Sequence, residues 1–151
     1  MRMALEEAQA AAAEGEAPIG AVIVDPTTGE VVARGRNAPI FQHDPTAHAE
    51  VRAIRAAAAA RGNYRLTGLD LYVTLEPCPM CAGAISHARL GRVFFGAEDA
   101  KGGGVLHGAR VFDHPQCHWR PQVEGGVLAQ ESADLLRGFF RARRPSRAGD
   151  A

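Results

Sequence analysis

The stretch LDLYVTLEPCPMCAGAISHARLG, residues 69–91, decides the fold of this chain. Residues 69–77 form an apolar run that Pro77 stops, which predicts a buried strand. A helical pattern follows over residues 80–91 and ends near Gly91. A strand that leads directly into a helix is typical of an α/β fold.

Strands and helices continue to alternate on both sides of this unit. Upstream we expect a helix at 1–16, strands at 18–24 and 31–37 around the turn DPTTGE, and a helix at 44–62. The first of these helices lacks an N-cap, so we expect the chain to begin inside it. Downstream we expect a strand at 92–99, a glycine-rich loop, a short strand at 122–128 and a helix at 129–144. This order predicts a mainly parallel or mixed sheet with helices on both faces. A single domain would span 1–144, followed by a flexible tail at 145–151.

Composition narrows the class of protein. The 17 basic and 17 acidic residues balance, so bulk charge does not predict a polyanionic partner, although residues 137–147 hold five arginines and no acid. No run is long enough to span a membrane, and from the residues given we expect no secretory signal. Three cysteines are too few for a disulfide framework, and we therefore expect a reducing compartment, most simply the cytoplasm.

Cys78 and Cys81 form a C-x-x-C pair at the start of the helix that follows the strand. Three residues apart on a first turn, both sulfurs can face one point, and the free N–H groups and helix dipole there favour thiolates. Three interpretations compete: a thioredoxin-like redox pair, a structural zinc site that needs a fourth ligand, and a catalytic zinc site with three protein ligands and an open position.

The segment HAE, residues 48–50, favours the catalytic zinc site. Its imidazole and carboxylate are two residues apart at a helix mouth, so they do not share a helix face and both can point beyond the helix end. His48 would complete a set of three ligands with Cys78 and Cys81. Two thiolates and a neutral imidazole already balance Zn²⁺, which leaves Glu50 free to act as a base on the water at the metal.

The pattern H-x-E followed by P-C-x-x-C resembles the signature of the zinc-dependent nucleobase deaminases. Further segments resemble bacterial tRNA-specific adenosine deaminases, over residues 3–144 in all. These segments are NAPI (37–40), HDPTAHAE (43–50), NYRL (63–66), LYVTLEPC (71–78), MCAGA (80–84), GRVFFGA (91–97), DAK (99–101) and FFRARR (139–144). The loop KGGGVLHG (101–108) departs from the family pattern.

The resemblance implies a three-layer α/β/α sandwich with a central five-stranded mixed sheet, one Zn²⁺ per chain and a homodimer. It implies that adenosine at the wobble position of an arginine tRNA anticodon is converted to inosine. Glu50 would move the protons of this reaction, and Asn37 would hold the purine through its side-chain amide, which can both donate and accept.

Other residues are candidates for substrate contact, each with an ordinary structural alternative. The full set of candidates is Asn37, Ala49, Asp99, Lys101, Phe140, Arg141, Arg143 and Arg144. Asn37 could instead end a strand, and Asp99 and Lys101 could serve a turn. The arginines could be a solvated face, and at least one of Phe139 and Phe140 is expected in the core.

Cys117, with His114 and His118, suggests a second cluster, but it lacks a C-x-x-C partner and is interpreted as a stray thiol in a loop.

Two rival functions remain open. One is a deaminase of free guanine, cytosine or a nucleoside, which uses the same chemistry without RNA. The other is a zinc-stapled module without catalysis, which would have no use for Glu50.

Overall fold

The structure, a computed structural model, describes residues 1–145, so the expected flexible tail lies almost wholly outside the described residues. The elements are α1 (Arg2–Ala13), β1 (Gly20–Val24), β2 (Val31–Arg36), α2 (Pro39–Gln42), α3 (Ala49–Arg61), β3 (Asp70–Leu75), α4 (Pro79–Ala88), β4 (Arg92–Ala97), the 3₁₀ turn η1 (Val111–Asp113), β5 (Gln122–Glu124) and α5 (Ala129–Arg143).

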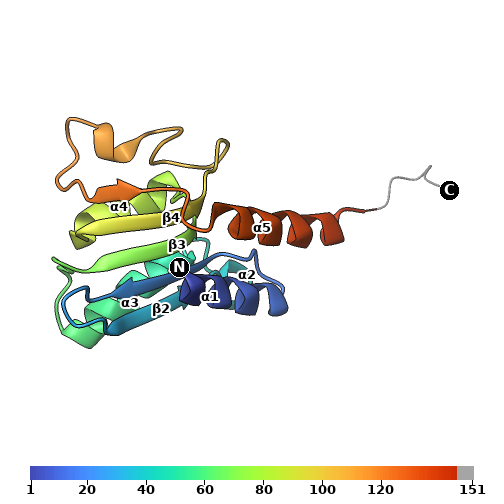
Figure 1. Cartoon of the computed structure of the whole chain (residues 1–151), viewed down its shortest axis with the longest axis horizontal. Coiled ribbons are helices and arrows are strands. Elements are labelled where there is room, and N and C mark those ends of the chain that lie inside the picture. The colour runs from blue at the N-terminus through green and yellow to red at the C-terminus, as the bar shows by residue number, and fades with distance from the viewer. Residues whose placement is uncertain (146–151) are drawn as a thin grey trace.

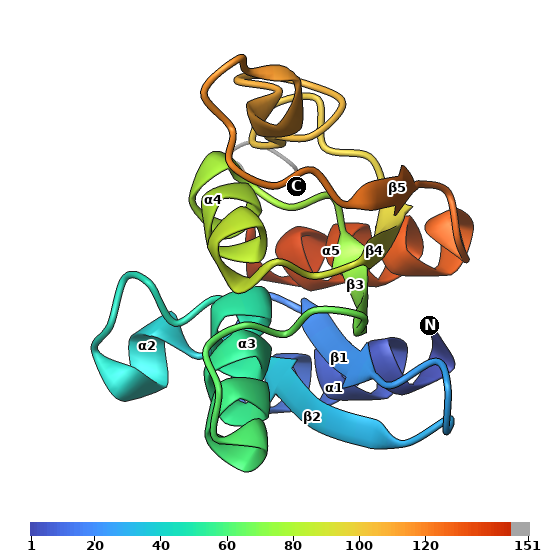
Figure 2. The same cartoon turned by 90° about the vertical axis from the view of Figure 1, so that its left-hand side faces the viewer.

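The five strands form one mixed sheet in the order β2-β1-β3-β4-β5. β1 is antiparallel to β2 and β3, whereas β3, β4 and β5 run parallel. Helices α3 and α4 cover one face, and α1 and α5 cover the other (Figures 1 and 2). The expected three-layer sandwich with a five-stranded mixed sheet is confirmed.

The main core lies between the sheet and the α3–α4 layer. Small alanine side chains from both helices pack there against large side chains of β3 and β4, such as Leu71 and Phe95. Gly35 of β2 lets α3 approach closely, because a Cβ at this position would lie 2.3 Å from the carbonyl oxygen of Ala49. This contact fixes the first turn of α3 on the sheet and therefore fixes His48, which precedes it.

The segment between β2 and α3 differs from the expectation. The helix begins at Ala49 and not at residue 44, and Pro39–Gln42 form the short helix α2, which the sequence did not predict. The carboxylate of Asp44 accepts hydrogen bonds from the N–H and hydroxyl of Thr46, at 2.8 and 2.7 Å. This Asx turn competes with helix formation and delays the start of α3 until after His48.

The last helix extends beyond the sheet that it covers, and its end projects away from the rest of the chain (Figure 1). Phe139 is therefore only partly buried and Phe140 is 50% exposed, so the expectation that one of them lies in the core is wrong. Within residues 1–145, every helix is too short or too polar to cross a bilayer.

Candidate active site

The two sequence signatures meet at the starts of neighbouring helices. His48 is the N-cap of α3 and Cys78 is the N-cap of α4, both with extended backbone, and Cys81 lies in the first turn of α4. Because α3 packs against α4 in the same layer, the two helix mouths lie side by side. The expectation that both motifs stand at helix starts is confirmed.

The three side chains form a compact group that fits a metal ion. The Nδ1 atom of His48 lies 3.4 Å from the sulfur of Cys81 and 3.6 Å from that of Cys78, and all three donor atoms lie within 4.8 Å of one another. A tetrahedral zinc ion with ordinary bond lengths holds its ligand atoms about 3.6 Å apart. In the part of the chain that the structure describes, no other group of histidines, cysteines and acids meets this criterion. The donor set therefore suits zinc, with a fourth position for water.

The pKa values of the two thiols shift in opposite directions. The contact with Cys81 lowers the pKa of the Cys78 thiol to about 5, and the same contact, with burial, raises the pKa of Cys81. Zinc binding would favour the deprotonated form of both, because both sulfurs bind zinc as thiolates.

Glu50, the second residue of α3, is 4% exposed and lies beside Cys81. Burial raises the pKa of its carboxyl above the ordinary value. Within residues 1–145 no lysine or arginine forms an ion pair with it. A buried carboxyl with a raised pKa binds a proton more readily than an ordinary one, which suits the proton transfers of general acid–base catalysis.

Two further residues offer polar atoms to a ligand: Asn37, whose neighbour Ala38 donates its N–H to the carbonyl of Ala47 at 3.0 Å, and Ala49, which follows His48. Asn37 follows β2 and is 6% exposed, and its side-chain oxygen has no hydrogen-bond partner among the described residues. Buried polar atoms are normally paired, so this oxygen suits a ligand that the protein must bind. The side chain of Ala49 is fully buried in the core, which leaves its main-chain N–H at the helix mouth for any substrate contact.

The structure gives Asp99 a turn role, which was the alternative to substrate contact. Its carboxylate accepts hydrogen bonds from the N–H groups of Lys101 and Gly102, at 3.1 and 2.9 Å. Lys101 itself is exposed. Sequence reasoning missed Glu76, a buried carboxylate just before Pro77 that binds this same loop. Its position between an apolar strand and the C-x-x-C pair was the signal that could have found it.

The basic end of α5 is not part of the metal group. α5 packs on β3, β4 and α1, whereas the helices that begin at His48 and Cys78 cover the opposite face of the sheet. Arg141, Arg143 and Arg144 are exposed, and within residues 1–145 none of them forms an ion pair. The guanidinium of Arg143 lies over the ring of Phe139, 3.5 Å from its centre.

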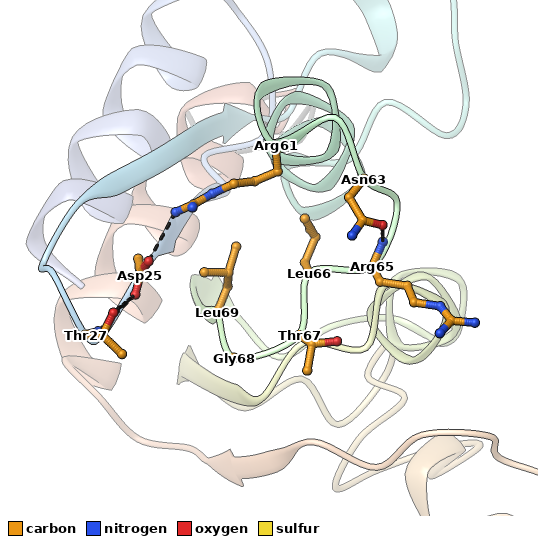
Figure 3. A pocket seen from close by; sticks show the side chains of 9 residues that line it. All are labelled: Asp25, Thr27, Arg61, Asn63, Arg65, Leu66, Thr67, Gly68 and Leu69. Atoms are coloured by element: carbon orange, nitrogen blue, oxygen red, sulfur yellow. Dashed lines mark hydrogen bonds and ion pairs between the residues drawn. The ribbon is translucent and has the colours of Figure 1, made fainter.

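Two other polar features lie away from this site. Cys117 donates to the carbonyl of Trp119 at 3.1 Å and contacts Ser86, and neither it nor its neighbouring histidines belong to the metal group. A depression of about 370 Å³ lies at the far end of α3 (Figure 3). There Arg61 points to Asp25 and binds it at 3.2 Å, so its charge is already paired.

Comparison with known proteins agrees with this geometry. Residues 1–97 match the cytidine and deoxycytidylate deaminase zinc-binding region. The tRNA-specific adenosine deaminase of Agrobacterium fabrum is 52% identical over 144 residues, which cover 95% of this chain and 93% of that protein. A structure solved in work on A-to-I editing at the wobble position of transfer RNA is 51% identical, with a TM-score of 0.87 over 90% of this chain and 97% of that one.

A more distant relative has a different substrate. The guanine deaminase of Bacillus subtilis is 33% identical, with a TM-score of 0.63, and the match covers 99% of this chain and 94% of that one. The identity is thus higher to the enzymes of transfer RNA than to this enzyme of a free base. The chain belongs to the family of bacterial tRNA-specific adenosine deaminases, within the zinc-binding cytidine and deoxycytidylate deaminases.

Proposed function

We propose that this protein hydrolyses the 6-amino group of adenosine at the wobble position of a tRNA anticodon, which yields inosine and ammonia. The observation that carries the proposal is the group of His48, Cys78 and Cys81 beside the buried Glu50, in a chain that is 52% identical to a tRNA-specific adenosine deaminase. An arginine tRNA is the proposed substrate, on the strength of the family resemblance.

The described residues can carry this reaction. His48, Cys78 and Cys81 would hold zinc between two helix starts. When bound, zinc lowers the pKa of water to about 7 and so supplies a nucleophile at neutral pH. Glu50 accepts a proton from the attacking water and delivers it to the ring nitrogen next to C6, and then transfers the hydroxyl proton at C6 to the 6-amino group, which leaves as ammonia. Asn37 and the N–H of Ala49 orient the purine from two sides.

An anticodon loop suits this site better than a duplex does. Bases in single-stranded RNA loops can be splayed out, and turning such a base into a pocket costs less than extracting it from a helix. The arginines at the end of α5, which form no ion pair among residues 1–145, provide positive charge for the phosphates, and Phe140 offers an exposed aromatic ring for stacking.

The proposal is tested by incubating the zinc-loaded protein with total tRNA and, separately, with guanine, cytosine and adenosine. We expect inosine at the wobble position of a tRNA by mass spectrometry, with little conversion of the free compounds. Rapid conversion of guanine with no change in tRNA would instead support the second candidate, a guanine deaminase, which the similarity to the Bacillus subtilis enzyme favours.

Replacing Arg141, Arg143 and Arg144 together by alanine should weaken tRNA deamination mainly through binding. The KM for tRNA should rise, and its dependence on salt should flatten, because each lost phosphate contact lowers the logarithmic slope by about one. Kinetics at several salt concentrations check this prediction. Since the three side chains are exposed and lie on the other face of the sheet from the metal group, zinc content should stay unchanged. An unaltered KM and salt slope would remove these arginines from the RNA site.

We further propose that the protein acts as a homodimer in the cytoplasm. Exposed apolar side chains on α2 and at the start of α4 could be covered by a second copy; they are Ile40, Phe41 and Met80. All three cysteines of the chain lie among the described residues and are free, which suits a reducing compartment.

A further inference from the structure

Glu76 is a buried carboxylate that binds a loop distant in sequence. It is 2% exposed and lies between β3 and Pro77, two residues before Cys78. One carboxylate oxygen accepts the N–H groups of Val105, Leu106 and His107, at 3.2, 3.0 and 3.2 Å. The other accepts the N–H of Asp99 at 3.2 Å and pairs with Nδ1 of His107 at 2.8 Å.

The same loop, residues 98–107, also touches the start of α4. The N–H of Gly104 donates to the carbonyl of Pro77 at 2.8 Å. A Cβ on Gly104 would lie 2.6 Å from the nitrogen of Pro79 and 2.9 Å from the carbonyl carbon of Cys78. The loop backbone is therefore pressed against the peptide that carries the metal ligand, with no room for a side chain between them.

This loop also carries side chains that face solvent next to the site. Lys101 is exposed and Leu106 is 43% exposed, on either side of the glycines. Because β3 and β4 are parallel, the peptide that bears Cys78 and the loop after β4 both follow the carboxyl ends of neighbouring strands and leave the sheet on the same side. The loop therefore lies beside the start of α4, and its exposed side chains are available to a substrate that reaches the metal group.

We propose that Glu76 is a positioning residue, which locks the 98–107 loop against the Cys78 end of α4 so that the loop forms a wall of the RNA site. This inference rests on the proposed function for the choice of substrate. Only an ionised carboxylate, which accepts hydrogen bonds at both oxygens and donates none, satisfies four N–H groups and an imidazole together. A glutamine has nearly the same shape, but its NH₂ group replaces one of the two accepting oxygens and cannot accept the N–H groups that point to it. The loop would therefore lose the hydrogen bonds on that side.

The test is Glu76→Gln, with Glu124→Gln as the matched control, because Glu124 lies on the exposed strand β5, away from the loop. We expect Glu76→Gln to keep one zinc per chain and to raise the KM for an anticodon stem-loop RNA about tenfold, with a smaller change in kcat. A partly unfolded or zinc-depleted sample would lower the apparent kcat and leave KM unchanged. Amide hydrogen exchange at residues 105–107 should speed up in Glu76→Gln and not in the control.

Gly103→Ala tests the lock from the other side if Glu76→Gln does not fold. Its Cβ would lie 2.3 Å from the Glu76 carboxylate, whereas a Cβ on Gly138, the control, meets no atom within 4 Å. Unchanged exchange at residues 105–107 in Glu76→Gln or Gly103→Ala would overturn the inference, as would loss of zinc with unchanged KM. If the wild-type protein leaves RNA untouched, the proposed function fails, but hydrogen exchange still decides whether Glu76 holds the loop.

Discussion

Glu50→Gln should lower kcat for tRNA deamination by about 10³- to 10⁴-fold, at the upper end of what general acid–base groups contribute. The amide of glutamine has nearly the shape of the carboxyl group but cannot take up and return a proton at neutral pH. Single-turnover kinetics on an anticodon stem-loop measure the effect on the chemical step, and a binding assay under the same conditions should give a nearly unchanged affinity.

The same variant should keep its zinc and its fold. Burial already raises the pKa of Glu50, which means that the site penalises the charged form, so a neutral amide costs little stability there. Glu124→Gln, on the exposed strand β5, is the control and should behave as wild type. A Glu50→Gln protein that deaminates tRNA at a near-normal rate would show that another group moves the protons. One that loses zinc would show that Glu50 supports the metal instead.

Local sequence patterns predicted the parts of this site that depend on one element at a time. The apolar run before Pro77 and the helical pattern after it fix the strand–helix unit, and with it the place of Cys78 and Cys81 at a helix start. His48 was predicted at a helix mouth for the same reason. That the N-termini of α3 and α4 lie together was predicted only by the additional argument that His48, Cys78 and Cys81 make one complete set of zinc ligands.

Contacts between distant segments were not predictable in this way. The backbone partners of Glu76 lie 23 to 31 residues further along the chain, and the periodicity of the sequence does not predict hydrogen bonds over such a separation. The start of α3 was misplaced because the Asx turn at Asp44 outweighed Pro45 and Thr46, which look like the first residues of a helix. Phe139 and Phe140 follow the apolar spacing of α5, but Phe139 is only partly buried and Phe140 is exposed, on a helix that extends beyond the sheet (Figure 1).

Cys78→Ser should abolish both zinc binding and activity, while Cys117→Ser, which removes a thiol outside the metal group, should change neither. A serine hydroxyl is not ionised at neutral pH and is a poor ligand for zinc, so the remaining two donors would hold the ion weakly. Elemental analysis of the purified proteins should give about one zinc per chain for wild type and Cys117→Ser, and almost none for Cys78→Ser.

Loss of zinc should also lower the melting temperature, because the ion ties the first turns of α3 and α4 together and its binding energy belongs to the folded state. A strong chelator should therefore lower the melting temperature of wild type and of Cys117→Ser, and should leave that of Cys78→Ser where it is. The comparison separates the loss of the ion from a packing defect caused by the serine. Loss of the ion alone predicts that Cys78→Ser melts at the temperature of chelator-treated wild type, whereas a packing defect would lower the melting temperature further. Full zinc content in Cys78→Ser would remove Cys78 from the ligand set, and the two helix starts would then need another reason to meet.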